Sequence, residues 1–256
     1  MTYPGTLAVS TAHLNRVADL LRAHRNRIKS PWRRLSCGQQ ALLVLAHLRN
    51  GDTYARLAEG FAIGVATVFR YVREAVDLLA AAAPTLTAAL WRLAHNGHHL
   101  GILDGTVVRI DRLGGPLDRL YYSGKHRHHG VNLQGLIDPR HGDLVWISDG
   151  LPGSVHDLRA ARAHRIISTA ATAEAELLAD KGYQGAGGTV TTPYKGRTLA
   201  KAQKAHNRMV NSVRGPGERG FAVLKSWRIL TKVRCCPRRV GPMAKAVLAL
   251  ELGPDS

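Results

Sequence analysis

Acidic residues are scarce in this chain. Its 256 residues contain 18 Asp and Glu against 36 Lys and Arg, which gives a formal net charge of +18. So large a positive excess in a globular chain indicates a polyanionic partner, and nucleic acid fits better than a membrane surface. The alternative is a protein that is basic for solubility alone, but its acids are distributed very unevenly along the chain.

Cysteines and long apolar runs are also rare. Three cysteines, of which Cys235 and Cys236 are adjacent, cannot form a disulfide framework, and no pair has the spacing of a zinc knuckle. No purely apolar run is longer than that of residues 78–83, which is far too short to cross a bilayer. No basic segment followed by an apolar run resembles a signal peptide at the N-terminus. We therefore expect a cytoplasmic protein, associated with the nucleoid, that does not bind membranes.

The length allows one substantial core and a smaller module. We predict three parts: a basic N-terminal segment over 1–35, a helical domain over 36–96 and an α/β domain over 97–256.

The helical part has the layout of a helix-turn-helix. Ser36 can cap a helix that stops at 50–51, and Thr53 can cap a short helix over 54–59. A tight connection over 61–64, with Ala62 near the position where glycine is usual, leads to a third helix over 65–82. The second helix of such a pair enters the major groove of DNA. Outward candidates for DNA contact are Thr67, Arg70 and Arg73; the alternative is an ordinary helical hairpin.

Strands and helices alternate in the second part. We predict strands over 100–110, 131–137, 143–148 and 174–179, a helical connector over 84–99, and helices over 155–167 and 201–213. A last helix can begin at Pro216 and continue through Trp227. This order predicts a mixed α/β layer in which helices cover a sheet.

Three acids stand out. Asp104 lies inside an apolar strand, and Asp180 ends another apolar strand. Glu218 is near the start of a helix and is the only acid between residues 181 and 250, against fifteen Lys and Arg. If the two strands are neighbours, three carboxylates converge on a site suited to Mg²⁺, or Mn²⁺ in its place. Two such ions would clamp an in-line phosphoryl transfer. The alternative is that each acid is solvated or ion-paired for structural reasons.

Several segments resemble the DDE transposases of bacterial insertion sequences, and more narrowly the insertion-sequence-five group that is similar to Harbinger transposases. The resemblance covers roughly residues 36–250 and rests on LDGT (103–106), YYSGKHRHHG (121–130), LPGSVHDLRA (151–160), LADKGYQG (178–185), TPYKGR (192–197) and GERGFAVLKSWRIL (217–230). In that group an Arg lies four residues before the catalytic Glu and a Lys seven after it. Arg214, Glu218 and Lys225 fit both spacings.

The resemblance implies an RNase H-like mixed sheet with flanking helices, preceded by an all-α helix-turn-helix domain. It implies that Asp104, Asp180 and Glu218 are metal ligands and catalytic residues. Arg214 and Lys225 would hold DNA phosphates. The implied partners are the inverted-repeat ends of the transposon and target DNA, bound by a homo-oligomer. The group often has Tyr three residues before its Arg, where this chain has Asn211, so activity of this copy is not implied by the resemblance alone.

Two further features have alternative readings. Asp157 matches a motif of the group and could support the site from beside it, but capping of a helix or pairing with Arg159 would also explain it. The histidine-rich stretch 125–129 has its histidines too close together for an ordinary structural zinc site. A basic loop facing DNA, with Lys125 and Arg127, fits better. Functionally, the alternatives to a transposase are a DNA-binding regulator that has lost catalysis and a nuclease that cuts without joining.

Overall fold

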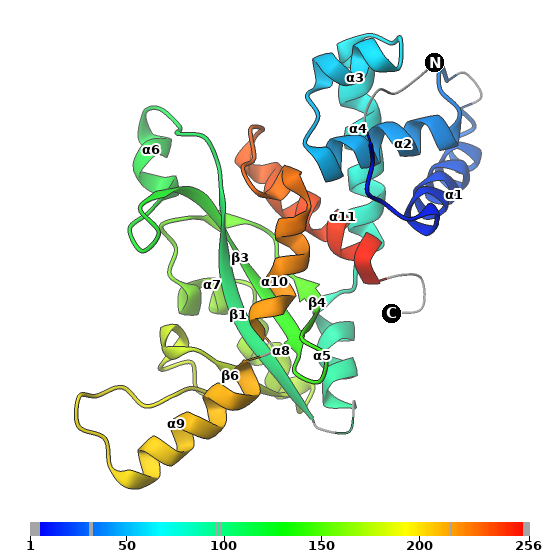
Figure 1. The fold of residues 1–256 in the computed structure, drawn as a ribbon. Helices are drawn as coiled ribbons and strands as arrows, with labels where there is room; N and C mark the ends of the chain where they lie inside the picture. The colour runs from blue at the N-terminus through cyan, green and yellow to red at the C-terminus, as the bar shows by residue number, and fades with distance from the viewer. Residues whose placement is uncertain (1–5, 31–32, 96, 98, 216, 253–256) are drawn as a thin grey trace. The chain divides into compact units, whose positions relative to one another are not determined.

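The computed structural model describes residues 6–30, 33–95, 97, 99–215 and 217–252 (Figure 1). They form two compact units. One is drawn from Met1–Ala83, Lys225–Lys232 and Pro242–Ser256, and the other from Pro84–Leu224 and Val233–Gly241. The chain is mixed α+β, as predicted: the first unit is helical and the second contains the sheet.

Four helices begin the first unit, and their caps are those that the sequence predicts. Ser36 caps the second helix in a reciprocal capping box with Gln39, and Gly51 ends that helix in the left-handed conformation. Thr53 accepts a hydrogen bond from the backbone N–H of Arg56 at the start of the third. The helices are α1 (Thr11–Arg27), α2 (Cys37–Asn50), α3 (Tyr54–Gly60) and α4 (Val65–Ala81).

The turn between α3 and α4 contains a residue in an unusual conformation. Ala62 has φ +52°, in the left-handed region that favours glycine. Phe61 and Ile63 on either side are buried, and they fix the turn by packing into the helical core. The helix-turn-helix layout is therefore present even though its turn lacks a glycine at this position.

The second unit is built around a mixed seven-stranded sheet. The long strand β1 (Leu100–Arg109) lies at its centre, antiparallel to β3 (His128–Asp138) and parallel to β6 (Glu176–Ala179). Short strands complete the sheet beside β3 and β6: β2 (Tyr122–Ser123), β4 (Asp143–Ile147), β5 (Leu151–Pro152) and β7 (Val190–Thr191). This arrangement is consistent with an RNase H-like fold.

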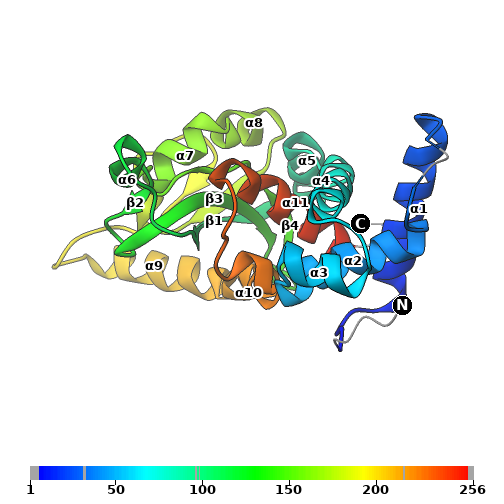
Figure 2. The same ribbon diagram turned by 90° about the horizontal axis from the view of Figure 1, so that it is seen from above.

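Helices cover both faces of this sheet (Figure 2). On one face, α5 (Leu86–Ala94), α7 (Asp157–Ala163) and α8 (Ile166–Thr172) pack on an apolar core that includes Leu103 and Leu136. On the other face lie α9 (Lys201–Arg214) and α10 (Gly217–Ser226). The remaining elements are α6 (Pro116–Tyr121), the short 3-10 helices η1 (Lys181–Tyr183), η2 (Arg228–Leu230) and η3 (Pro237–Arg239), and α11 (Val240–Leu252).

One predicted helix is wrong in its extent. The single helix expected over 155–167 is divided into α7 and α8, because Arg165 between them adopts the left-handed conformation with φ +57°. The start of the last predicted helix, Pro216, lies outside the described residues.

One segment, Val65–Ala94, is long and apolar enough by composition to cross a membrane, a test that core helices of water-soluble proteins also pass. Here Pro84 separates α4 from α5. Each helix also buries an apolar stripe, from Val68 to Leu79 in α4 and from Ala89 to Ala94 in α5. Packing within the two units thus buries part of the apolar surface of the segment.

Candidate active site

Asp104 lies in β1, and Asp180 directly follows the last residue of the neighbouring parallel strand β6. Leu103 of β1 is in register with Ala179, the last residue of β6, so the next residue in both segments is an aspartate. Paired strands are about 4.8 Å apart, and residues opposite each other point to the same face. Because Leu103 and Ala179 both point into the core beneath α7 and α8, the two aspartates project from the face that α9 and α10 cover.

Each aspartate is held by one backbone N–H. The N–H of Gly105 donates to Oδ1 of Asp104 at 2.9 Å, and the N–H of Gly182 donates to Oδ1 of Asp180 at 2.7 Å. No described residue donates a hydrogen bond to the Oδ2 atom of either side chain. Two half-buried carboxylates therefore present free acceptor oxygens on one face of the sheet.

Burial raises the pKa of Asp104 above its ordinary value, and the negative charges of Asp180 and Asp157 raise it further. The Gly105 N–H and the positive charge of Arg214 act in the opposite direction. Asp180, Asp157 and Arg214 are therefore close enough to Asp104 for their charges to act on its carboxylate. A cation between Asp104 and Asp180 would stabilise the charged form of Asp104.

The helix that carries Glu218 packs on the face from which the two aspartates project. A Cβ at Gly217 would lie 3.2 Å from Ile102, and one at Gly220 would lie 2.8 Å from Ile137. Ile102 and Ile137 are paired across β1 and β3 and flank Asp104 on its own face. The backbone at Glu218 is thus close to this face of the sheet, while the Glu218 side chain lies outside the described residues.

On the opposite face, directly behind Asp104, polar side chains form a buried network. Oδ1 of Asp157 accepts hydrogen bonds from Nδ2 of Asn132 at 2.9 Å and from Nε2 of Gln134 at 3.4 Å. Oε1 of Gln134 accepts from the hydroxyl of Tyr183 at 2.6 Å. The network ends close against β1, since a Cβ at Gly105 would lie only 2.6 Å from Oδ1 of Asp157. It connects the strand that carries Asp104 to the turn that follows Asp180.

Tyr183 is fully buried in this network. Burial raises its pKa well above the ordinary value, and the charges of Asp157, Asp104 and Asp180 raise it further, against a smaller opposing effect of the hydrogen bond to Gln134. Its hydroxyl therefore stays protonated and remains a donor at any ordinary pH. A permanent donor at this point keeps the Gln134 amide in one orientation.

Asp157 does not pair with Arg159, which was one of the two explanations for it. Its Oδ2 atom instead lies 3.5 Å from Nζ of Lys125. Asp157 does not reach Arg159 because it starts α7 with its side chain turned to the sheet, where the amides of Asn132 and Gln134 donate to its carboxylate. A cleft of about 140 Å³ opens here, with Lys125 and His126 in its wall.

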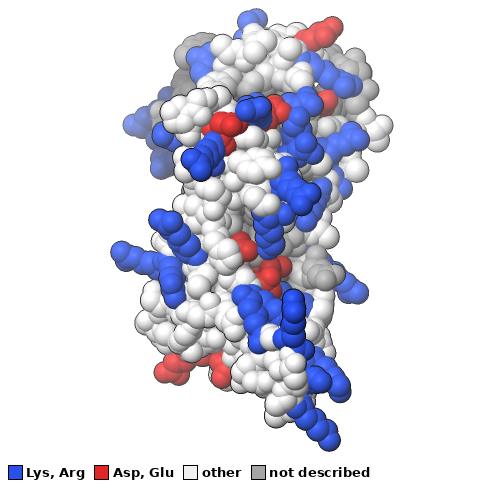
Figure 3. Space-filling model, turned by 90° about the vertical axis from the view of Figure 1, so that its left-hand side faces the viewer, with Lys and Arg blue, Asp and Glu red and all other residues white. Residues whose placement is uncertain are grey.

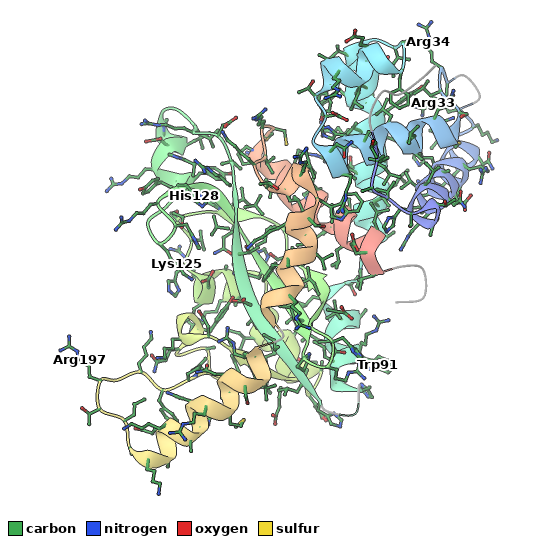
Figure 4. All side chains as sticks on the ribbon, in the orientation of Figure 1. Arg33, Arg34, Trp91, Lys125, His128 and Arg197 are labelled. Atoms are coloured by element: carbon green, nitrogen blue, oxygen red, sulfur yellow. The ribbon has the colours of Figure 1, made fainter. Side chains whose placement is uncertain are left out.

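The other predicted DNA-binding residues are found in two places. In the second unit, Lys125 and Arg127 are exposed in the loop before β3, where Figure 4 labels Lys125, and Arg214 ends α9. Nε of Arg214 is buried and has no hydrogen-bond partner among the described residues.

In the first unit, Lys225 is exposed, and so are Arg70 and Arg73 on α4; Nη2 of Arg70 donates to Oγ1 of Thr67 at 3.3 Å. Asn211, at the position where the resembled group has Tyr, is exposed on α9.

Among the described side chains, no three His, Cys, Asp or Glu residues are gathered closely enough to hold a metal ion. This holds for the histidines of the loop before β3 as well, where His129 hydrogen-bonds to Asp118. A three-carboxylate site thus depends on Glu218, whose side chain is outside that search.

The network residues Asn132, Gln134 and Tyr183 were not singled out from the sequence. A signal for two of them exists in the strand Val131-Asn132-Leu133-Gln134, where polar residues alternate with apolar ones and therefore share one face. The partner of that face could not be read locally, since it comes from α7 and η1.

Comparison with known proteins identifies the family of this chain. Residues 103–251, more than half of the chain, match the family described as DDE superfamily endonuclease. Residues 33–85 match the helix-turn-helix of DDE superfamily endonuclease. A relative named "Probable transposase for insertion sequence element IS702", from Microchaete diplosiphon, is 28% identical over 236 residues, which cover 87% of this chain and 83% of that protein. No solved structure matches. The chain belongs to the DDE superfamily endonucleases and carries their helix-turn-helix domain ahead of the endonuclease domain.

Proposed function

We propose that the chain is a transposase that binds the ends of its insertion sequence and catalyses metal-dependent cleavage and strand transfer of DNA. The observation that carries the proposal is that Asp104 and Asp180 directly follow the paired residues Leu103 and Ala179, while the start of α10, the helix that carries Glu218, packs on the face from which Asp104 projects. The insertion-sequence relative supports the cellular role. Membership of the insertion-sequence-five and Harbinger-like group stays a prediction.

Asp104, Asp180 and Glu218 would hold a divalent cation, with Mg²⁺ as the natural choice, Mn²⁺ as a substitute and two ions as the expected number. The donor set fits, because it offers carboxylate oxygens only and two of them have no hydrogen-bond donor among the described residues. When bound, such ions supply Lewis-acid stabilisation of charge on the phosphate oxygens and lower the pKa of water.

Asp180 fits the middle position of this set better than Asp157 does. Asp180 follows Ala179, the register partner of Leu103, and so lies beside Asp104, whereas Asp157 lies behind the strand, where it is engaged by Asn132 and Gln134. Asp157 therefore supports the site from behind and does not contact the reacting phosphate.

The reaction proceeds by two displacements at phosphorus. Water attacks a phosphodiester at the transposon end; one P–O bond forms, another breaks, and the leaving oxygen takes a proton as a free 3′-hydroxyl. That hydroxyl then attacks a phosphodiester of the target, again exchanging one P–O bond for another. Arg214, whose charge already acts on Asp104, would hold a phosphate oxygen at the site. Positioning and electrostatic stabilisation account for most catalysis of this kind.

The helix-turn-helix would supply recognition of the ends. Arg70 and Arg73 are exposed on α4, the second helix of the pair, and Thr67 lies one turn before Arg70. Two ends must be held together for strand transfer, so we expect a homo-oligomer on DNA.

The test is an assay of purified protein with the terminal inverted repeats of its element, target DNA and Mg²⁺. The wild type should give cut ends and joined products. Asp104→Asn and Asp104→Ala should give neither while still binding the repeats, and the matched Asp143→Asn, at an exposed acid of β4, should behave as wild type. Cut ends without joined products would mean a nuclease, and binding alone by the wild type would mean a regulator; either result overturns the proposal.

A further inference from the structure

A basic arm projects from the second unit beside the candidate active site. It consists of residues 192–214: the loop 192–200 and helix α9 (Figure 1). Of the residues of α9, all of which the structure describes, only Val210 is buried. Packing of this helix against the sheet accounts for little of its sequence, so the exposed side chains call for another explanation.

The loop is fastened to the helix by side-chain bonds. The amide of Asn207 pairs with both backbone groups of Tyr194: Oδ1 accepts from the Tyr194 N–H at 2.7 Å, and Nδ2 donates to the Tyr194 carbonyl at 3.1 Å. The ring of His206 packs edge-on against the ring of Tyr194, with 5.0 Å between centroids. Loop and helix therefore form one body, and the cations of both are displayed together.

Five cations are exposed on this arm and no acid accompanies them: Lys195, Arg197, Lys201, Lys204 and Arg208. None of them forms an ion pair with a described residue. Arg197 lies at the outer end of the loop and points away from the ribbon in Figure 4. The space-filling view of this side of the molecule shows, in its lower half, Lys and Arg side chains on both sides of a small acidic area (Figure 3).

The spacing on the helix fits a phosphate backbone. Lys201, Lys204 and Arg208 follow at intervals of three and four, so they lie along one stripe that rises about 10 Å at 1.5 Å per residue. Four successive phosphates on one strand of a duplex rise by a similar amount, in three steps of about 3.4 Å each. The same helix ends at Arg214, whose charge acts on Asp104, so the helix leads from the stripe toward the carboxylates.

We propose that the arm, through Lys201, Lys204 and Arg208 with the loop cations Lys195 and Arg197, binds the phosphate backbone of the duplex that flanks the scissile phosphodiester. The inference rests on the proposed function, in which DNA is the substrate. Contact with phosphates is nevertheless sequence-independent and can be measured without catalysis. It assigns the arm to DNA and not to a second copy of the chain.

The experiment measures the salt dependence of binding to a duplex of arbitrary sequence, in chelator, so that neither end recognition nor cleavage contributes. The binding constant falls with salt, so the slope of its logarithm against log salt is negative. Removal of one phosphate contact should make this slope less steep by about 0.9 and should weaken binding at low salt by on the order of tenfold. Lys204→Gln should show that change, and the triple variant Lys201→Gln, Lys204→Gln, Arg208→Gln about three times the change in slope. Lys and Gln have similar helix propensities, so α9 should be retained.

Two controls separate the charge effect from others. Lys204→Arg should keep the wild-type slope, because it keeps the charge. Arg92→Gln, on α5 at the opposite face of the sheet, should also keep it. An unchanged slope in the triple variant would overturn the proposal. If self-association were weakened in the same variant, the arm would be assigned to a second copy of the chain. A wild type that fails to cut DNA would refute the proposed function alone, since the slope does not depend on cutting.

Discussion

The hydroxyl of Tyr183 donates a 2.6 Å hydrogen bond to Oε1 of Gln134, behind the strand that carries Asp104. Tyr183 follows Asp180 by three residues, and Gln134 pairs with Gly105, the residue after Asp104. One buried bond thus ties together the backbone segments that present the two candidate catalytic aspartates.

Tyr183→Phe should destabilise the second unit by about 1–3 kcal/mol, because it leaves a buried amide oxygen without its donor. The pKa of Tyr183 is raised in the folded state. The contribution of Tyr183 to the free energy of unfolding is therefore complete below the ordinary tyrosine pKa of about 10 and is lost as the pH rises above that value. The difference in melting temperature between wild type and variant should therefore shrink above that pH. Tyr194→Phe, at an exposed ring, is the control and should be neutral. A neutral Tyr183→Phe would show that the bond does not stabilise the fold.

Asp104→Asn should stabilise the protein at neutral pH in the presence of a chelator. The pKa of Asp104 is raised in the folded state, chiefly by burial, so its charged form disfavours folding. The loss of stability caused by the charged form of Asp104 is absent below the ordinary aspartate pKa of about 3.9. It grows as the pH rises to the raised pKa of the folded state and is constant above that pKa. Melting temperatures of the two proteins should converge at acid pH and separate at neutral pH. A variant that is less stable at neutral pH would contradict this.

Gly105→Ala should destabilise the second unit by about 1–3 kcal/mol, because its Cβ would lie 2.6 Å from Oδ1 of Asp157 and 2.9 Å from Nε2 of Gln134. The comparison is Gly38→Ala in α2, where a Cβ meets nothing within 4 Å and alanine is the better helix former. Urea unfolding should show opposite signs for the two variants. Equal effects would mean that the contact behind β1 is not tight.

Ala62→Gly should stabilise the helix-turn-helix. The left-handed conformation costs alanine about 1–2 kcal/mol, and glycine removes this cost while adding roughly 0.4–1 kcal/mol of unfolded-state entropy. A net gain of about 0.5–1 kcal/mol is expected from the difference. The measurement is thermal unfolding followed by helix content, and a loss of stability would show that the methyl group of Ala62 contributes to packing.

The sequence predicts those features that depend on neighbours along the chain. Ser36 and Thr53 mark helix starts because their side chains cap the residues that follow, and both caps are confirmed. Asp104 is conspicuous because it interrupts an apolar strand. The division at Arg165 was missed because the left-handed residue there is neither Gly nor Asn and leaves no local signal.

What could not be read from the sequence is set by pairing between distant strands. The placement of Asp180 beside Asp104 depends on the parallel register of β1 and β6. The position of Asp157 behind Gly105 depends on how α7 packs on β3. Residues far apart along the chain meet in both cases, so from the sequence the choice of Asp180 over Asp157 rests on the resemblance alone.

That choice is tested most directly by the cleavage rates of Asp180→Asn and Asp157→Asn, measured side by side on the terminal repeats at saturating Mg²⁺. Asp180→Asn removes a proposed metal ligand, so cleavage should fall below detection while end binding persists. Asp157→Asn keeps an oxygen that can accept from Asn132 and Gln134, so cleavage should continue at a reduced rate. Cleavage that survives in Asp180→Asn and is abolished in Asp157→Asn would contradict the assignment of Asp104, Asp180 and Glu218.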